Sequence, residues 1–201
     1  MGSRNPSKDA AVGFTIKSGW ASVVLVVGSA TAPLVVDSRR IDLSDPAVPE
    51  SQQPYHAGFG TARGAGQELS RLVASVKRFG RRSVSALIGQ YQTAGYAVHG
   101  AGMVVGSLVD PKTIANDHIR IHALEGQLFR GVVEDAVGRS GLPCAIWRER
   151  DLYGVAAAAL ERPERALRES LATLGRGVEG PWRAEQKAAT LSAWLVLAGR
   201  P

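Results

Sequence analysis

Two histidines and a glutamate stand at helical spacing in the segment NDHIRIHALEGQLF. His118 and His122 are four residues apart and Glu125 follows three later, so in a helix the three side chains share one face. They could chelate a divalent metal ion, with Asp110 or Asp117 as a further ligand. Alternatively, they form a polar seam that hydrogen-bonds to backbone groups beside the core. Zinc proteases carry Glu directly after the first histidine, whereas this chain has an isoleucine there, so protease chemistry is excluded.

Basic residues are candidates for binding phosphate groups. The stretch KRFGRR concentrates four of them around Phe79, and another lysine ends a strand-like run beside the turn Ser18-Gly19. In both places the side chains either contact nucleic acid, because Lys and Arg displace counterions from phosphates, or are ordinary solvated surface residues. The candidate nucleic-acid contacts are Lys17, Lys77, Arg78, Arg81 and Arg82.

The segment HAGFGTARGAGQ, residues 56–67, is rich in glycine and precedes a helix-like pattern. A helix N-terminus with free amides can bind an anion, but this segment lacks the Lys-Ser/Thr pair of a P-loop. It is therefore either a mobile loop or an anion-binding loop. His56 and His99 both stand in glycine-rich surroundings, and the sequence does not connect them to each other.

The composition favours a polyanionic partner. The chain has 201 residues and a formal net charge of +6, which attracts nucleic acid or a ribonucleoprotein. Part of the charge is Arg interleaved with Glu, as in ERPERALRES, which is typical of a solvated helix face with ion pairs along the helix. The single cysteine, Cys144, excludes an internal disulfide and a zinc site built from thiolates. In its apolar surroundings we expect it to be a buried hydrophobe.

The pattern of apolar runs bounds the location and the domain organisation. No run reaches the roughly 18 to 20 apolar residues that a membrane helix requires, and the first residues lack the apolar core of a signal peptide. We therefore expect a cytoplasmic protein that does not act at a membrane. We expect residues 1–10 to be disordered and residues 11–201 to form a single domain.

The apolar periodicity predicts the elements that carry these residues. Three strand-length runs joined by short turns predict an antiparallel meander, and a long loop over residues 44–66 follows it. Gly80 is expected to break or kink the first long helix, Asp110-Pro111 to open the second, and Gly180-Pro181 to open the last. The expected strands are 12–17, 20–28, 33–43, 102–109 and 144–148, and the expected helices are 67–94, 110–138 and several between 151 and 199.

This order of elements predicts an α/β fold. The sheet is expected to be mixed and five-stranded, with a three-strand antiparallel meander plus two parallel strands. Helices are expected on both faces, because parallel strands require helical crossovers.

Three segments resemble the ribonuclease H-like fold, and most of all its Holliday-junction resolvase (RuvC-like) group. GFTIKSGWASVVLV is similar to the opening strand, glycine turn and second strand of that group. ALEGQLFRGVVEDAVGRSGLPCAI is similar to its Gly-Gln helix and fifth strand, and EQKAATLSAWLVLAG to its closing Ala-rich helix. The resemblance implies a ribonuclease H-like domain.

Active enzymes of that fold bind two divalent metal ions through carboxylates from the first strand, the fourth strand and the last helix. By the resemblance, Lys17 stands where the first strand carries Asp, and a lysine would repel a metal ion. The fourth strand has no acidic residue until Asp110. On the last helix the corresponding position falls near Thr190, and the nearest carboxylate is Glu185. The resemblance therefore implies a degenerate active site, with Asp110 and Glu185 as the remaining catalytic candidates.

Three functions follow from these observations. The leading hypothesis is a non-catalytic ribonuclease H-like binding or assembly module for nucleic acid or a ribonucleoprotein, without a cofactor. The second is a nuclease or phosphodiesterase dependent on Mg or Mn, with ligands relocated to Asp110, His118, His122 and Glu125. The third is a self-associating structural protein, a homo-oligomer anchored by exposed Trp182 and Trp194 on its C-terminal helices.

Overall fold

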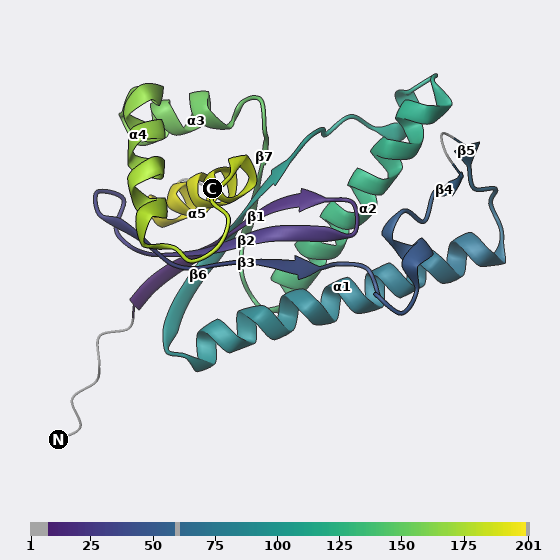
Figure 1. Cartoon of the computed structure of the whole chain (residues 1–201), viewed down its shortest axis with the longest axis horizontal. Coiled ribbons are helices and arrows are strands. Elements are labelled where there is room, and N and C mark those ends of the chain that lie inside the picture. The colour runs from purple at the N-terminus through teal and green to yellow at the C-terminus, as the bar shows by residue number, and fades with distance from the viewer. Residues whose placement is uncertain (1–7, 59–60, 200–201) are drawn as a thin grey trace.

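A mixed β-sheet of five strands lies at the centre of the protein (Figure 1). The computed structural model describes residues 8–58 and 61–199. The strand order in the large sheet is β3-β2-β1-β6-β7. These strands are β1 (Lys8–Lys17), β2 (Trp20–Gly28), β3 (Pro33–Asp42), β6 (Tyr96–Val105) and β7 (Cys144–Arg148).

The strand pairing confirms the predicted topology. β1 pairs antiparallel with β2, and β2 pairs antiparallel with β3, which makes the meander. β6 lies parallel to β1, and β7 lies parallel to β6. The crossovers that parallel pairing demands contain α1 (Gln67–Thr93) and α2 (Asp117–Arg139).

Helices cover both faces of the sheet, as predicted (Figure 1). α1 and α2 pack against each other on one face. On the other face α5 (Ala184–Leu197) contacts β1, β2 and β6, and α3 (Leu152–Ala159) and α4 (Glu164–Leu174) pack on α5. No helix in the described part of the chain combines the length and the apolar character needed to cross a bilayer.

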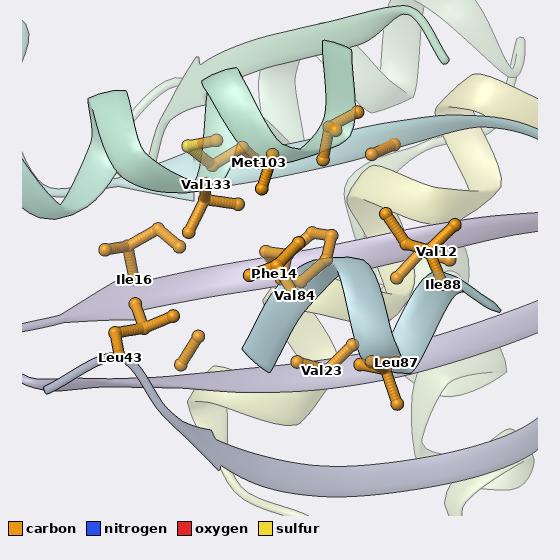
Figure 2. Packing of buried hydrophobic residues seen from close by; sticks show 14 of the residues in the cluster. Val12, Phe14, Ile16, Val23, Leu43, Val84, Leu87, Ile88, Met103 and Val133 are labelled. Atoms are coloured by element: carbon orange, nitrogen blue, oxygen red, sulfur yellow. The ribbon is translucent and has the colours of Figure 1, made fainter. Parts of the chain in front are cut away.

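The side chains of β1 alternate between the two faces. Val12, Phe14 and Ile16 enter the core beneath α1 and α2 (Figure 2). Ala11 packs instead in the cluster beneath α5. Since β1 is buried on both faces, its sequence is an almost unbroken apolar run. Further residues of the first core that Figure 2 labels are Val23, Leu43, Val84, Leu87, Ile88, Met103 and Val133.

Two glycines let α5 approach the sheet closely. Gly13 on β1 and Gly102 on β6 are register partners. A Cβ atom on Gly13 would lie 1.8 Å from the carbonyl oxygen of Ala189, and a Cβ on Gly102 would lie 2.5 Å from that of Ser192. Both contacts are with the helix backbone, which cannot turn aside as a side chain can. Glycine at these two strand positions therefore sets the distance between helix and sheet.

Gly80 does not break α1, contrary to the prediction. The helix runs unbroken through it, and a Cβ there would lie 2.7 Å from Cγ1 of Val132 on α2 and 2.9 Å from the carbonyl oxygen of Leu43. Gly80 is buried because α2 and the end of the meander press against α1 at this point. Its small size serves packing between helices, and the surrounding residues keep the chain helical.

Several predicted boundaries are wrong. β6 begins at Tyr96, after Gly95 with its φ of +85°, and ends at Val105, so the expected strand 102–109 is displaced toward the C-terminus. Asp110 caps a short 3-10 helix, Pro111–Thr113, and α2 itself begins at Asp117. In each case a local cap or turn sets the boundary, and the periodicity of apolar residues does not reveal such a cap or turn.

The helical boundaries later in the chain follow the same rule. Asn116 caps α2, because its side chain accepts a hydrogen bond from the amide of Ile119 at 3.0 Å. The last helix begins at Ala184 and not at Gly180-Pro181, since Arg183 and Gln186 form the cap. The start of α2 therefore lies seven residues beyond Asp110 and faces the loop over residues 44–66.

The N-terminal segment and the long loop are more ordered than predicted where they are described. Residues 8–10, expected to be disordered, belong to β1, and residues 1–7 lie outside the described residues. The loop over residues 44–66 contains a 3-10 helix, Pro49–Gln52, and a small two-stranded sheet of β4 (His56–Gly58) and β5 (Thr61–Ala62).

Of the two tryptophans expected to be exposed anchors, one is fully buried and the other is partly buried. Trp194 is fully buried, and its Nε1 donates a hydrogen bond of 2.8 Å to the carbonyl oxygen of Ala30. Trp182 is partly buried, and its Nε1 donates one of 2.9 Å to that of Leu171. The self-association hypothesis thus loses the anchors that motivated it.

Candidate phosphate and metal sites around helix α2

The first candidate site is a cavity at the edge of the sheet where β1 and β6 end. It has a volume of about 510 Å³ and lies between these strand ends and α2. Lys17 comes from the end of β1, Arg130 comes from α2, and Gly106 and Ser107 follow β6. Among the described residues that line it there are two cationic side chains and no carboxylate. Such a lining suits an anion.

Neither cation of this cavity is neutralised by a buried partner in the described chain. Nζ of Lys17 lies 3.9 Å from Oε2 of Glu149, and both side chains are more than a third exposed. An exposed pair at that distance contributes little and yields to a competing anion. Arg130 is half-buried and has no ion pair or hydrogen bond among the described residues.

The second candidate site lies at the start of α2, where three histidines meet. The predicted pair, His118 and His122, projects from α2, and His56 joins it from β4. One ring nitrogen of each histidine lies within 4.8 Å of one on both others. Nε2 of His118 and Nε2 of His122 are 3.3 Å apart. These side chains border a cavity of about 690 Å³ that Glu50 and Arg63 also line.

Glu125 lies behind the histidines and holds His56. Its side chain is fully buried, and Oε1 is 2.8 Å from Nδ1 of His56. Oε2 accepts a longer hydrogen bond, 3.4 Å, from the hydroxyl of Ser18 in the turn after β1. A buried carboxylate requires such partners, because burial without them costs several kcal/mol. Burial, together with the charge of Glu125, raises the pKa of Tyr55.

The predicted metal set therefore assembles differently from the expectation. Asp110 is not part of the histidine group; its carboxylate accepts a hydrogen bond of 3.0 Å from the amide of Lys112. Glu125 was expected to bind the metal directly, but its carboxylate contacts His56 instead. His56 completes the group, and no spacing along the chain connects it with α2, which lies more than sixty residues away.

The positions that the ribonuclease H resemblance assigns to catalytic carboxylates hold other contacts. Thr190 is fully buried, and its hydroxyl donates a hydrogen bond of 2.7 Å to the carbonyl oxygen of Gln186 within α5. Glu185 lies in the first turn of α5, where its backbone carbonyl accepts a hydrogen bond of 2.8 Å from Thr15. Neither Glu185 nor Asp110 lines either cavity.

The basic stretch KRFGRR lies in the middle of α1. Arg81 is paired with Asp135 of α2 at 2.7 Å, and hydrogen bonds from Arg139 and Arg81 lower the pKa of that carboxylate. Arg81 thus takes part in an ion pair between α1 and α2. Lys77 and Arg81 line a further cavity between α1 and α2, and Gln127 lines both this cavity and the one that holds Lys17. Arg78 and Arg82 are exposed on α1.

Two other residues singled out by the sequence lie apart from these sites. His99 is exposed on β6 and pairs with Asp9 at 2.7 Å. Cys144 is largely buried, and its burial raises the pKa of the thiol to about 12, so it behaves as the hydrophobe that was predicted. Arg130 was missed, although its helical spacing from Ile119 and Gly126 places it on the cavity face of α2.

The fold and its strand order define an α/β protein with the ribonuclease H-like fold. No protein-family model and no curated protein sequence matches the chain. Among solved structures it is similar to Thermus thermophilus RuvC in complex with a Holliday junction substrate, with 8% identity, a TM-score of 0.57, and coverage of 95% of this chain and 94% of that one. A second structure of Thermus thermophilus RuvC has 13% identity and a TM-score of 0.50, over 94% and 96% of the two chains. The predicted RuvC-like fold is confirmed.

Proposed function

We propose that the protein is a non-catalytic nucleic-acid-binding module that holds phosphate groups at the ends of β1 and β6. The observation that carries this proposal is that Lys17 and Arg130 line one cavity, whose described lining has no carboxylate. Two-metal cleavage of a phosphodiester needs carboxylates to hold the ions. Cations at that place repel metal ions and attract the phosphate itself.

The surface beyond this cavity supports a longer contact with the nucleic-acid backbone. Gln127 of α2 connects the cavity to the groove that contains Lys77 and Arg81 of α1. A strand that enters over Lys17 and Arg130 can therefore continue across α2 toward the exposed cations of α1. The net charge of +6 favours this association through counterion release.

The similarity to RuvC supports nucleic acid as the class of partner, because one of the two solved RuvC structures contains a Holliday junction substrate. The function proposed for this chain, however, includes binding and no cleavage. Thr190 is buried and satisfied within α5, and Asp110 caps its own 3-10 helix. The nuclease hypothesis with relocated ligands is not proposed further, since Asp110 and Glu125 are held in other contacts.

Binding is tested with a labelled four-way junction, duplex, single-stranded DNA and RNA–DNA hybrid, measured by fluorescence anisotropy across a series of salt concentrations. Lys17→Ala and Arg130→Ala should each weaken binding and reduce the slope of log K against log salt by about 0.9 on duplex DNA. Arg165→Ala is the matched control, because Arg165 is exposed on α4 and pairs with Glu169 of its own helix.

Cleavage is tested in the same samples with Mg²⁺ or Mn²⁺. The proposal expects binding without cleavage. Metal-dependent cleavage that Asp110→Asn or His118→Ala abolishes would refute the non-catalytic assignment. Binding that is equally weakened by Arg165→Ala and Lys17→Ala would refute the assignment of the phosphate site.

A further inference from the structure

We propose that His56, His118 and His122 bind a zinc ion, with Glu125 as the group that orients His56. The proposal does not depend on nucleic-acid binding, because the three histidines border a separate cavity beside Glu50 and Arg63, although His122 also lines the cavity of Lys17. It rests on three observations: the convergence of three imidazoles, the buried carboxylate behind one of them, and the cavity that the three border.

The spacing of the imidazole nitrogens fits a tetrahedral ion. Zn–N bonds of about 2.0 to 2.1 Å at tetrahedral angles place neighbouring ligand nitrogens roughly 3.3 Å apart. Nε2 of His118 and Nε2 of His122 are separated by 3.3 Å, and a nitrogen of His56 lies within 4.8 Å of both. To bring the nitrogen of His56 to the same distance from the other two, β4 must move slightly or the side chains of His118 and His122 must rotate. β4 and these two side chains lie at the surface.

The contact between Glu125 and His56 is the one that a metal-binding histidine usually makes. A carboxylate that accepts the Nδ1–H fixes the tautomer and leaves the Nε2 lone pair for the ion. Here the carboxylate is fully buried, lies 2.8 Å from Nδ1, and comes from the same helix as the other two histidines. A polar seam would not need a fully buried charge to orient one partly exposed ring. This buried carboxylate is the observation that separates a site from a chance cluster.

The ligand types select the ion. Three neutral imidazoles suit zinc and its transition-metal neighbours, whereas Mg²⁺ and Ca²⁺ take oxygen ligands. Three protein ligands leave the fourth position of zinc open, as in catalytic sites, and here that position faces the cavity of about 690 Å³ beside Glu50 and Arg63. The site can therefore accept water or an anionic group of a small ligand.

Zinc at this place also ties the long loop to α2. His56 belongs to β4, whereas His118 and His122 belong to α2, so a shared ion would join the two. Arg63 in the same loop is mostly buried and donates hydrogen bonds to the carbonyl oxygens of Pro54 and His56. Trypsin can reach the peptide bond after Arg63 only when the loop opens, and zinc should slow that cleavage.

The experiment titrates the metal-free protein with Zn²⁺ in competition with a chromophoric chelator, and repeats the titration with Co²⁺ to record its visible spectrum. We expect one ion per chain and the intense d–d bands of tetrahedral Co²⁺. His118→Ala and His122→Ala should each lose tight binding, and since both side chains are exposed, these variants keep the fold. Glu125→Gln should weaken zinc binding roughly 10- to 100-fold.

His99→Ala is the matched control, because His99 is exposed and lies outside the cluster. It should bind zinc like the unmodified chain. Zinc should slow tryptic cleavage after Arg63 in the unmodified chain and in His99→Ala, but not in His118→Ala. The proposal is overturned if no stoichiometric zinc binds, or if His99→Ala weakens binding as much as His122→Ala. It is equally overturned if zinc binds without protecting the loop, since His56 would then not be a ligand.

Discussion

Replacing Gly13 by alanine should destabilise the protein strongly, because the new methyl group would enter the backbone of α5. The Cβ would lie 1.8 Å from the carbonyl oxygen of Ala189 and 2.6 Å from its carbonyl carbon. An ordinary contact is about 3.4 Å, so helix and strand would have to separate by roughly 1.6 Å. The hydroxyl of Ser192 donates hydrogen bonds to the carbonyl oxygens of Gly102 and Ala189, and this separation would lengthen them as well.

Overpacking of a core typically costs 1 to 3 kcal/mol, and a clash with backbone belongs at the upper end, so we expect about 3 kcal/mol for Gly13→Ala. For a domain of this size that loss lowers Tm by roughly 6 to 12 °C. Gly154→Ala is the control, because Gly154 lies in α3 and, apart from its neighbours and the backbone of its own helix, no atom lies within 4 Å of its hypothetical Cβ. It should be neutral or stabilising by up to about 1 kcal/mol.

Urea denaturation followed by circular dichroism measures both variants. A loss below about 1 kcal/mol for Gly13→Ala, or equal losses for the two variants, would refute the claim that glycine sets the distance between helix and sheet.

Two further predictions concern buried groups. At pH 8 the folded chain should react with iodoacetamide at Cys144 roughly a thousandfold more slowly than a thiol of pKa 9.0, because burial raises its pKa to about 12; fast labelling of the folded chain would contradict the burial. Because the unfolded thiol ionises near 9 and the folded one keeps its proton to about 12, this group also makes stability fall as the pH rises above about 9. Trp194→Phe should cost about 1 to 3 kcal/mol in urea denaturation, since it leaves the carbonyl oxygen of Ala30 without its donor, and an unchanged stability would show that this bond contributes nothing.

The fold could be predicted from the sequence because its signals are local. The runs that became β1, β2 and β3 are apolar, of strand length and separated by turns, so the meander and the mixed sheet followed from them. The ion pairs predicted for ERPERALRES are present between Arg165 and Glu169 and between Arg168 and Glu164, because spacing along a helix fixes such contacts.

The errors arose where tertiary contact overrides a local signal. Gly80 is a helix breaker by propensity, but packing of Val132 and Leu43 against it holds the helix together. Trp194 was expected to be an exposed anchor, yet it fills the core between α3, α4 and α5. Burial of this kind depends on elements that are distant in sequence.

The candidate sites were half predictable for the same reason. His118, His122 and Glu125 share a helix face, and their spacing reveals it. His56 reaches them only because the loop over residues 44–66 folds back against α2. No pattern in the sequence marks that contact.

Glu125 connects the two proposed sites. One carboxylate oxygen faces His56 in the histidine cluster, and the other accepts a hydrogen bond from Ser18, which follows Lys17 in the phosphate cavity. The same buried carboxylate thus contacts both the turn that presents the lysine and the ring that would complete the proposed zinc site. Each site is nevertheless tested by its own measurement, because metal binding and nucleic-acid binding are recorded separately.

The proposed phosphate site is tested by the salt dependence of four-way junction and duplex binding, compared between the unmodified chain and the double variant Lys17→Ala/Arg130→Ala. If these cations hold phosphate groups, the slope of log K against log salt should fall by about 1.8 on duplex DNA, and neither protein should cleave with Mg²⁺ or Mn²⁺. An unchanged slope would overturn the phosphate site, and metal-dependent cleavage by the unmodified chain would overturn the non-catalytic function.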